Sequence, residues 1–130
     1  MSHALTPRQR RAKRRTARTI LRQRTATNRL VASVRRRPRS LATVAIAAGV
    51  AKDTASGIAA GLRSVAKRIG VTPALVARTR RTVKGGRSRQ THNVHRYTLA
   101  QVRQLLAAYS PRKAAYVAAA SLITALAVTL

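Results

Sequence analysis

Apolar and basic residues occupy different stretches of this chain, and the pattern changes three times along its 130 residues. Before residue 40 apolar side chains are sparse. Residues 40–62 carry only two charges, and from 63 to 82 basic and apolar residues alternate at helical spacing, which places Val65, Ile69 and Val76 in a core. Adjacent glycines at 85 and 86 interrupt the pattern, and Leu and Ala dominate from 97 onward. The pattern therefore predicts an all-α fold of short Ala-rich helices.

These changes divide the chain into four regions. We expect an Arg-rich arm over 1–40, a small helical region over 41–82, a Gly-containing basic linker over 83–96, and C-terminal helices with an uncharged apolar tail over 97–130. In the arm, Thr6 and Pro7 resemble an N-cap followed by Pro at the first helical position. Because the like charges of the arm repel each other and few apolar residues compensate, we expect it to be long, basic and largely disordered until a polyanion binds.

The charge of the chain is almost entirely of one sign. Lys and Arg number 28, Asp53 is the single carboxylate, and the formal net charge is +27. Most of the cations are Arg, whose planar guanidinium binds phosphate oxygens in pairs. A charge of this size matches the phosphates of about 13 base pairs of duplex. This excess of cations predicts sequence-independent binding, neutralisation and condensation of double-stranded DNA. A basic RNA-binding protein is an alternative.

The residues expected to contact phosphate are the cations of the arm and those flanking the glycine pair. They are Arg8, Arg10, Arg11, Lys13, Arg14, Arg15, Arg18, Arg22, Arg24, Arg35, Arg36, Arg37, Arg39, Arg78, Arg80, Arg81, Arg87 and Arg89. The runs 8–15 and 35–39 also look like nuclear-import signals.

Candidate catalytic and metal-binding groups are few. With one carboxylate and no Cys, the chain offers no paired carboxylates and no thiolate nucleophile, so we expect no enzymatic activity and no cofactor. His92 and His95 have the spacing of a ligand pair, but no Cys, Asp or Glu lies nearby to complete a metal site. The three aromatic residues are expected to pack on helices rather than to stack on bases; they are Tyr97, Tyr109 and Tyr116.

A helix-turn-helix pattern occurs over residues 65–78. Ala66 precedes Gly70 by four residues and Val76 by ten, an order that suits two helices joined by a turn. The alternative function is therefore a helix-turn-helix transcriptional regulator of bacterial or phage origin, with residues 73–81 in the major groove. The same order recurs at 44–56, but two complete modules do not fit at that offset. The earlier copy is the weaker one, because residues 51–61 carry only one Lys and one Asp.

The C-terminal region contains a helix signal and an uncharged end. Thr98 is expected to cap a short amphipathic helix, and Ser110–Pro111 resembles a further helix start. After Lys113 the remaining 17 residues carry no charge. Since a bilayer span needs about 20 apolar residues, the pattern disfavours a membrane anchor. We expect this segment to pack on other helices of the chain, to self-associate, or to contact a capsid.

Several of these features together resemble the Arg-rich core proteins of adenoviruses, of the protein VII and protein X type. The composition of the chain is similar to that of those proteins: Arg exceeds Lys, the apolar segments are rich in Ala, and acids are nearly absent. The segment Val83–Arg87 is similar to the site of the adenoviral maturation protease, which makes the bond between Gly86 and Arg87 a candidate cleavage site; a glycine hinge is the alternative. The resemblance implies packaging of double-stranded DNA in the virion core and delivery to the host nucleus. For a bacterial protein, the corresponding place is the nucleoid.

Overall fold

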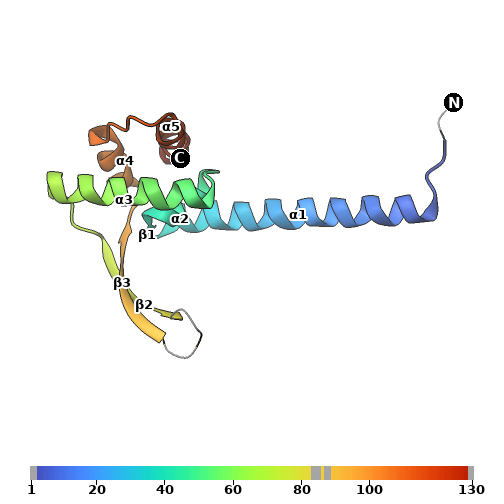
Figure 1. Ribbon diagram of the computed structural model, residues 1–130, viewed down its shortest axis with the longest axis horizontal. Helices are drawn as coiled ribbons and strands as arrows, with labels where there is room; N and C mark the ends of the chain where they lie inside the picture. Colours follow the sequence, from blue (N-terminus) through green and yellow to red (C-terminus); the bar gives the residue numbers. More distant parts are fainter. Residues whose placement is uncertain (1–2, 83–85, 87–88, 129–130) are drawn as a thin grey trace. The chain divides into compact units, whose positions relative to one another are not determined.

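The computed structural model describes residues 3–82, 86 and 89–128 (Figure 1). The chain divides into two compact units, Met1–Leu30 and Val31–Leu130. Over the described residues the helices and strands are α1 (Pro7–Arg36), β1 (Arg39–Ser40), α2 (Leu41–Ala47), α3 (Lys52–Ile69), β2 (Leu75–Thr82), β3 (Arg89–Tyr97), α4 (Leu99–Ala108) and α5 (Ala114–Val128).

The prediction of an all-α fold is wrong, because the described part of the second unit contains a three-stranded antiparallel sheet. Its strand order is β1-β3-β2, and the long hairpin β2–β3 covers most of the region expected to be a helix end and a linker. Burial along β2 alternates with a period of two: Ala77 and Thr79 are half-buried, whereas Arg78 and Arg80 are exposed. This alternation is the signature of a strand with one face turned to solvent. The fold is therefore α+β.

The prediction of a disordered arm is also wrong, because α1 begins at Pro7. Thr6 and Gln9 form a reciprocal capping box, in which the Thr6 amide donates to Gln9 Oε1 at 2.9 Å and the Gln9 amide donates to Thr6 Oγ1 at 3.3 Å. Arg, Ala, Gln and Leu fill most of the helix and are strong helix formers. These propensities outweigh the charge repulsion on which the prediction of disorder rested. The predicted cap at Thr6 is confirmed, and α1 ends at Arg36 because Pro38 disfavours the helical conformation of the residue before it.

The core of the second unit lies where α2, α3, α4 and α5 meet. Its largest fully buried side chains come from all four helices: Ile58, Leu62, Leu105, Ile123, Val44 and Val102. Of the three core positions predicted from periodicity, Val65 is buried, whereas Ile69 and Val76 are 43% and 49% exposed. They are exposed because α3 ends at Ile69 and Val76 lies on an outward strand face.

Two glycines of α3 allow the C-terminal segments to pack closely on that helix. A Cβ at Gly57 would collide with the Tyr116 hydroxyl, and one at Gly61 would come within 3.0 Å of the Tyr109 ring. Tyr109 and Tyr116 therefore pack on α3, whereas they were expected on the Leu-rich helix of the C-terminal region. The apolar C-terminal segment forms α5, which packs on α2, α3 and α4. Within the described residues, no helix has both the length and the hydropathy that crossing a membrane requires.

A helix-turn-helix is present, but at the earlier of its two sequence matches. Helices α2 and α3 are joined by a short turn at Gly49, whose φ of 97° is readily adopted only by glycine. The later match is wrong, because Gly70 ends α3 in the left-handed conformation and residues 75–82 then form β2. The start expected at Ser110–Pro111 does not begin a helix, whereas Thr98 caps α4 with a full capping box.

Candidate nucleic-acid interface

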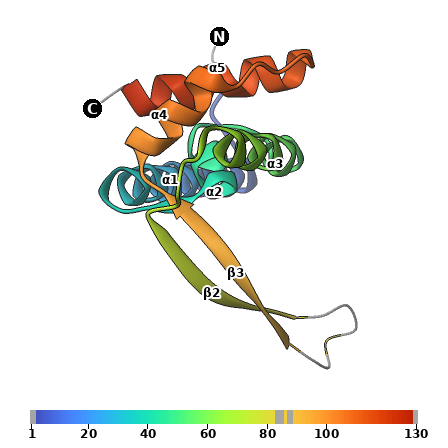
Figure 2. The same cartoon turned by 90° about the vertical axis from the view of Figure 1, so that its left-hand side faces the viewer.

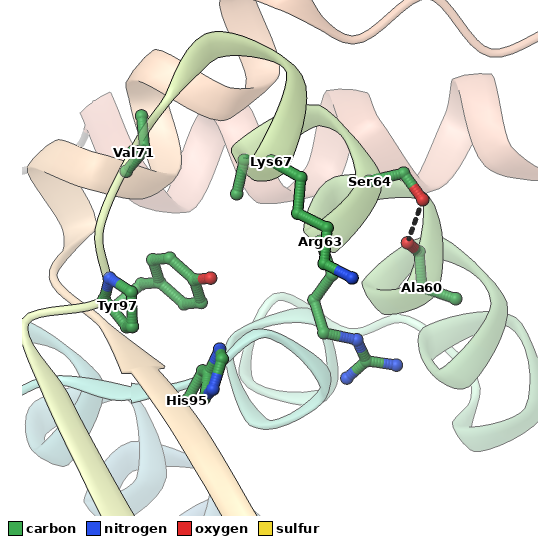
Figure 3. Close-up of a pocket in the computed structure, with 9 residues that line it drawn as sticks. Ala60, Arg63, Ser64, Lys67, Val71, His95 and Tyr97 are labelled. Atoms are coloured by element: carbon green, nitrogen blue, oxygen red, sulfur yellow. Dashed lines mark hydrogen bonds between the residues drawn. The ribbon is translucent and has the colours of Figure 1, made fainter.

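Figure 2 shows the hairpin β2–β3 extending away from the helices at an angle to α3, and we call the surface shared by these two elements the concave surface. At its base is a pocket of about 400 Å³ to which both elements contribute. Figure 3 shows Arg63 and Lys67 reaching this pocket from α3, while the Tyr97 ring points into it from β3. The lining residues are Ala60, Arg63, Ser64, Ala66, Lys67, Val71, Pro73, His95 and Tyr97. We call this the α3–hairpin pocket.

Helix α3 presents an outward stripe of small and basic residues to this surface. Ser56, Ala60, Arg63 and Lys67 recur at spacings of three and four and are all exposed. The opposite stripe is apolar and buried, which fixes the rotation of the helix about its axis. Since Ser56 and Ala60 precede the two cations of the stripe and have short side chains, a ligand can approach the helix backbone closely at these two positions.

The hairpin adds cations through its register. Val76 pairs with His95, Arg78 with Asn93 and Arg80 with Thr91, so these residues share one face of the two strands. Because His95 lines the α3–hairpin pocket, this is the face that continues from the pocket along the hairpin. Arg78 and Arg80 are both exposed on it. The concave surface therefore carries Arg side chains from two segments that are distant in the sequence.

Tyr97 contributes a hydroxyl that remains protonated at neutral pH. The residue is only 3% exposed, and this burial raises the pKa of its phenol above the ordinary value of 10.0, while the Arg63 guanidinium opposes the rise. The Ser64 hydroxyl donates to the Ala60 carbonyl oxygen at 3.2 Å. Since the Ser64 hydrogen is used within the helix, the donors available to the pocket include Arg63, Lys67 and the Tyr97 hydroxyl, and the first two are cations. Such a set suits a phosphate oxygen.

The pair His92 and His95 does not form a shared site. The two residues are three apart in β3, so their side chains lie on opposite faces of the hairpin, His92 with Thr79 and His95 with Val76. In the part of the chain that the structure describes, no group of three His, Cys, Asp or Glu residues could hold a metal ion.

The structure places the predicted contact residues in three groups. In the first unit, the cations of α1 from Arg8 to Arg24 are all exposed. In the second, Arg35, Arg36 and Arg37 are exposed, Arg39 is half-buried in β1 opposite Tyr97, and Arg78 and Arg80 lie on the concave surface. Only the backbones of Arg81 and Arg89 are described, in β2 and β3. Gly86 is exposed with a φ of 74°, but Arg87, and with it the candidate cleavage bond, lies outside the described residues.

Four residues of the α3–hairpin pocket are not among the contacts singled out from the sequence: Arg63, Lys67, His95 and Tyr97. The two cations belong to the basic residues between 63 and 96, for which phosphate binding is expected as a group, and their spacing on an otherwise apolar helix is a detectable signal. Their association with His95 and Tyr97 is not detectable, since it depends on a hairpin in a region predicted to be helix and linker.

Arg68, beside Lys67, has a different role from its neighbour. Its guanidinium donates to the carbonyl oxygen of Ala108 at 2.7 Å and so satisfies a carbonyl at the C-terminal end of α4.

Comparison with known proteins gives no relative from which a role for the residues of the candidate interface could be inferred. No family model matches the chain, and neither a curated protein nor a solved structure matches it.

Proposed function

We propose that this protein is a non-enzymatic DNA-binding protein that neutralises and condenses double-stranded DNA with little sequence preference. The observation that carries the proposal is the concave surface of the second unit, where Arg63 and Lys67 of α3 and Arg78 and Arg80 of the hairpin are exposed on facing elements. The whole chain supplies one carboxylate against 28 cations, so these groups must find their counter-charges outside the protein. The phosphate backbone supplies them at high density.

The helix-turn-helix supports a duplex as the ligand. A helix of the width of α3 fits the major groove of B-form DNA, which is about 12 Å wide, whereas the deep and narrow major groove of an RNA duplex excludes it. The hairpin could then follow the adjacent backbone with Arg78 and Arg80. This arrangement favours DNA over the RNA alternative.

Little sequence preference is expected because of what α3 presents. Base edges are read mainly by Arg, Lys, Asn and Gln side chains near the start of a recognition helix. The exposed residues of the first half of α3 are Lys52, Asp53, Ser56 and Ala60. Of these, only Lys52 is a cation, and Asp53 repels phosphate. Contacts through phosphates should therefore dominate.

Helix α1 supplies a second set of cations, most of which belong to the first unit. It contains 30 residues and no acid, and at about 1.5 Å of rise per residue it could follow roughly 45 Å of polyanion. We propose that its exposed arginines bind phosphates independently of the concave surface. In the setting that the adenovirus core-protein resemblance implies, this protein would package a viral genome in the virion core and enter the host nucleus with it.

A second candidate function is a sequence-specific helix-turn-helix regulator, which the α2–α3 arrangement favours. The two candidates differ in how binding depends on sequence and salt. We would measure affinity for several unrelated duplexes of equal length, and for RNA duplexes, over a series of salt concentrations. A steep loss of affinity with salt and similar affinities for all DNA sequences are expected. A preference of about a thousandfold for one sequence would instead identify a regulator.

A further inference from the structure

Helix α5 is apolar on the side that faces the core and also on the side that faces solvent. Ala119, Ile123 and Ala127 are buried, as expected of a packed helix. The opposite side consists of Val117, Ser121, Thr124 and Val128, which succeed one another at spacings of three and four and are all exposed. We call these four residues the outer stripe. Val117 is 46% and Val128 65% exposed.

The two hydroxyls of the outer stripe do not make it polar. Ser121 Oγ donates to the carbonyl oxygen of Val117 at 3.1 Å, and Thr124 Oγ1 donates to that of Ala120 at 2.8 Å. Because each hydroxyl hydrogen is already bonded within the helix, covering the stripe leaves no donor unsatisfied. An open groove of about 660 Å³ runs beside these residues, and Pro111 and Ala120 also line it. A helix that is apolar all round is normally buried on all sides, so the stripe requires a cover.

The distribution of charge over the chain indicates which partner can bury the outer stripe. No residue after Lys113 is charged, whereas exposed cations stand on α1, α3, the hairpin and α4, and at Arg112 and Lys113 just before α5. A second copy that approached any of those elements would bring cations against cations. Along the outer stripe itself, from Val117 to Val128, two copies meet without a charged residue, while Lys113 lies one turn before Val117 with its Nζ 5.7 Å from the Tyr116 ring centroid. An acidic partner, by contrast, would gain nothing from a stripe that itself carries no cation.

We propose that two copies of this chain associate through the outer stripe of α5 in a two-fold contact, and that the resulting dimer bridges two DNA duplexes. Stripes spaced by three and four residues pack against one another as in other helix pairs. A contact of one helix from each copy is smaller than a standard interface of roughly 1,600 Å². The dimer is therefore weak in solution and becomes populated on DNA, where the local concentration of the protein is high.

The bridging geometry results from the arrangement of the second unit and depends on the proposed DNA binding. Figures 1 and 2 both show α4 and α5 on one side of α3 and the hairpin on the other. The outer stripe faces away from α3, because the opposite side of α5 packs in the core. A two-fold axis at the stripe would hold the two concave surfaces apart. Each surface then contacts a different duplex, or a distant part of the same one.

The test uses two pairs of matched variants. Ser121→Arg places a cation in the stripe, and Gln104→Arg adds the same charge at an exposed position of α4. Because the chain contains no Cys, Ser121→Cys and Gln104→Cys each introduce a single thiol that reports copy-to-copy contact by disulfide formation. Circular dichroism and affinity for a single duplex establish that each variant is folded and binds.

We expect the unmodified chain and Gln104→Arg to reach twice the monomer mass in sedimentation equilibrium at high concentration, and Ser121→Arg to remain monomeric. On DNA, the first two should capture a free labelled duplex on a tethered one, whereas Ser121→Arg should bind the tethered duplex without capturing a second. Under mild oxidation, Ser121→Cys should cross-link and Gln104→Cys should not. Efficient bridging by Ser121→Arg, or flotation of the unmodified chain with uncharged lipid vesicles, would overturn the proposal. If the protein binds no DNA at all, the proposed function fails, while sedimentation still tests the dimer.

Discussion

Lys67 and Arg68 are adjacent cations of α3 that face different neighbours. Lys67 lines the α3–hairpin pocket, whereas the Arg68 guanidinium donates to the Ala108 carbonyl oxygen at 2.7 Å. One residue thus belongs to the candidate interface and the other to the packing of α3 against α4. Formal charge alone does not distinguish them, but the structure assigns them different effects.

The first prediction separates these two roles. Arg68→Gln should lower the free energy of unfolding by about 1 kcal/mol, because a hydrogen bond from a charged donor to the end of α4 is lost. Lys67→Gln should leave stability unchanged and weaken DNA binding. Urea denaturation and duplex titration of both variants measure this. The two different roles are wrong if both variants show the same changes in stability and in DNA affinity.

The second prediction concerns the number of phosphates held by the concave surface. Replacing Arg63 and Lys67 together by Gln should reduce the slope of log affinity against log salt by about two, since each phosphate contact contributes roughly 0.9. Arg103→Gln removes a cation from an exposed position of α4 and is the control. Its slope should stay close to that of the unmodified chain. If the slope fell by the same amount per removed charge in the double variant and in Arg103→Gln, the cations would act only through the net charge of the protein.

The third prediction tests the close packing of α5 on α3. Replacing Gly by Ala within a helix normally stabilises it by about 1 kcal/mol. Gly57→Ala should instead destabilise the protein by about 1–3 kcal/mol, because its Cβ would collide with the Tyr116 hydroxyl. Adding Tyr116→Phe removes that oxygen and should recover part of the loss. Thermal unfolding of the single and double variants provides the measurement, and a stabilised Gly57→Ala variant would contradict the packing.

The fourth prediction concerns alkaline pH. Burial raises the pKa of Tyr97, so folding favours its neutral phenol. The corresponding stability is fully present below the ordinary pKa of 10.0 and is lost as pH rises through the raised value in the folded protein. Tyr97→Phe cannot ionise and should therefore lose less stability over that range. Burial also raises the pKa of Tyr109, so some loss should remain. Denaturant titrations from neutral pH to above 10, with absorbance of the ionised phenol, test this.

The local signals of the sequence predicted some helix ends well and failed where the continuation depended on distant residues. The caps at Thr6 and Thr98 were predicted, because a capping box is contained within four residues. Gly49 and Gly70 were both recognised as turn positions, and both have positive φ. The element after Gly70 was predicted wrongly, since residues 75–82 become a strand only by pairing with residues 89–97.

The candidate site was only partly predictable for the same reason. Arg78 and Arg80 were singled out individually by charge, but Arg63 and Lys67 were not, because neither lies in a dense basic run. Their significance comes from His95 and Tyr97, which the fold brings to the same pocket from about 30 residues farther along the chain. The helical state of residues 7–36 could have been predicted by weighing the propensities of Arg and Ala against repulsion.

The register of the hairpin constrains how this protein could change its length. Arg78 and Arg80 lie on the face of His95 because every second residue of a strand points the same way. Deleting one residue between the pocket and these arginines would turn both of them to the other face, although composition and net charge would hardly change. Changes of two residues would keep them on the concave surface. Length changes within residues 75–80 should therefore be tolerated in steps of two, because an even change keeps both arginines on the face of His95.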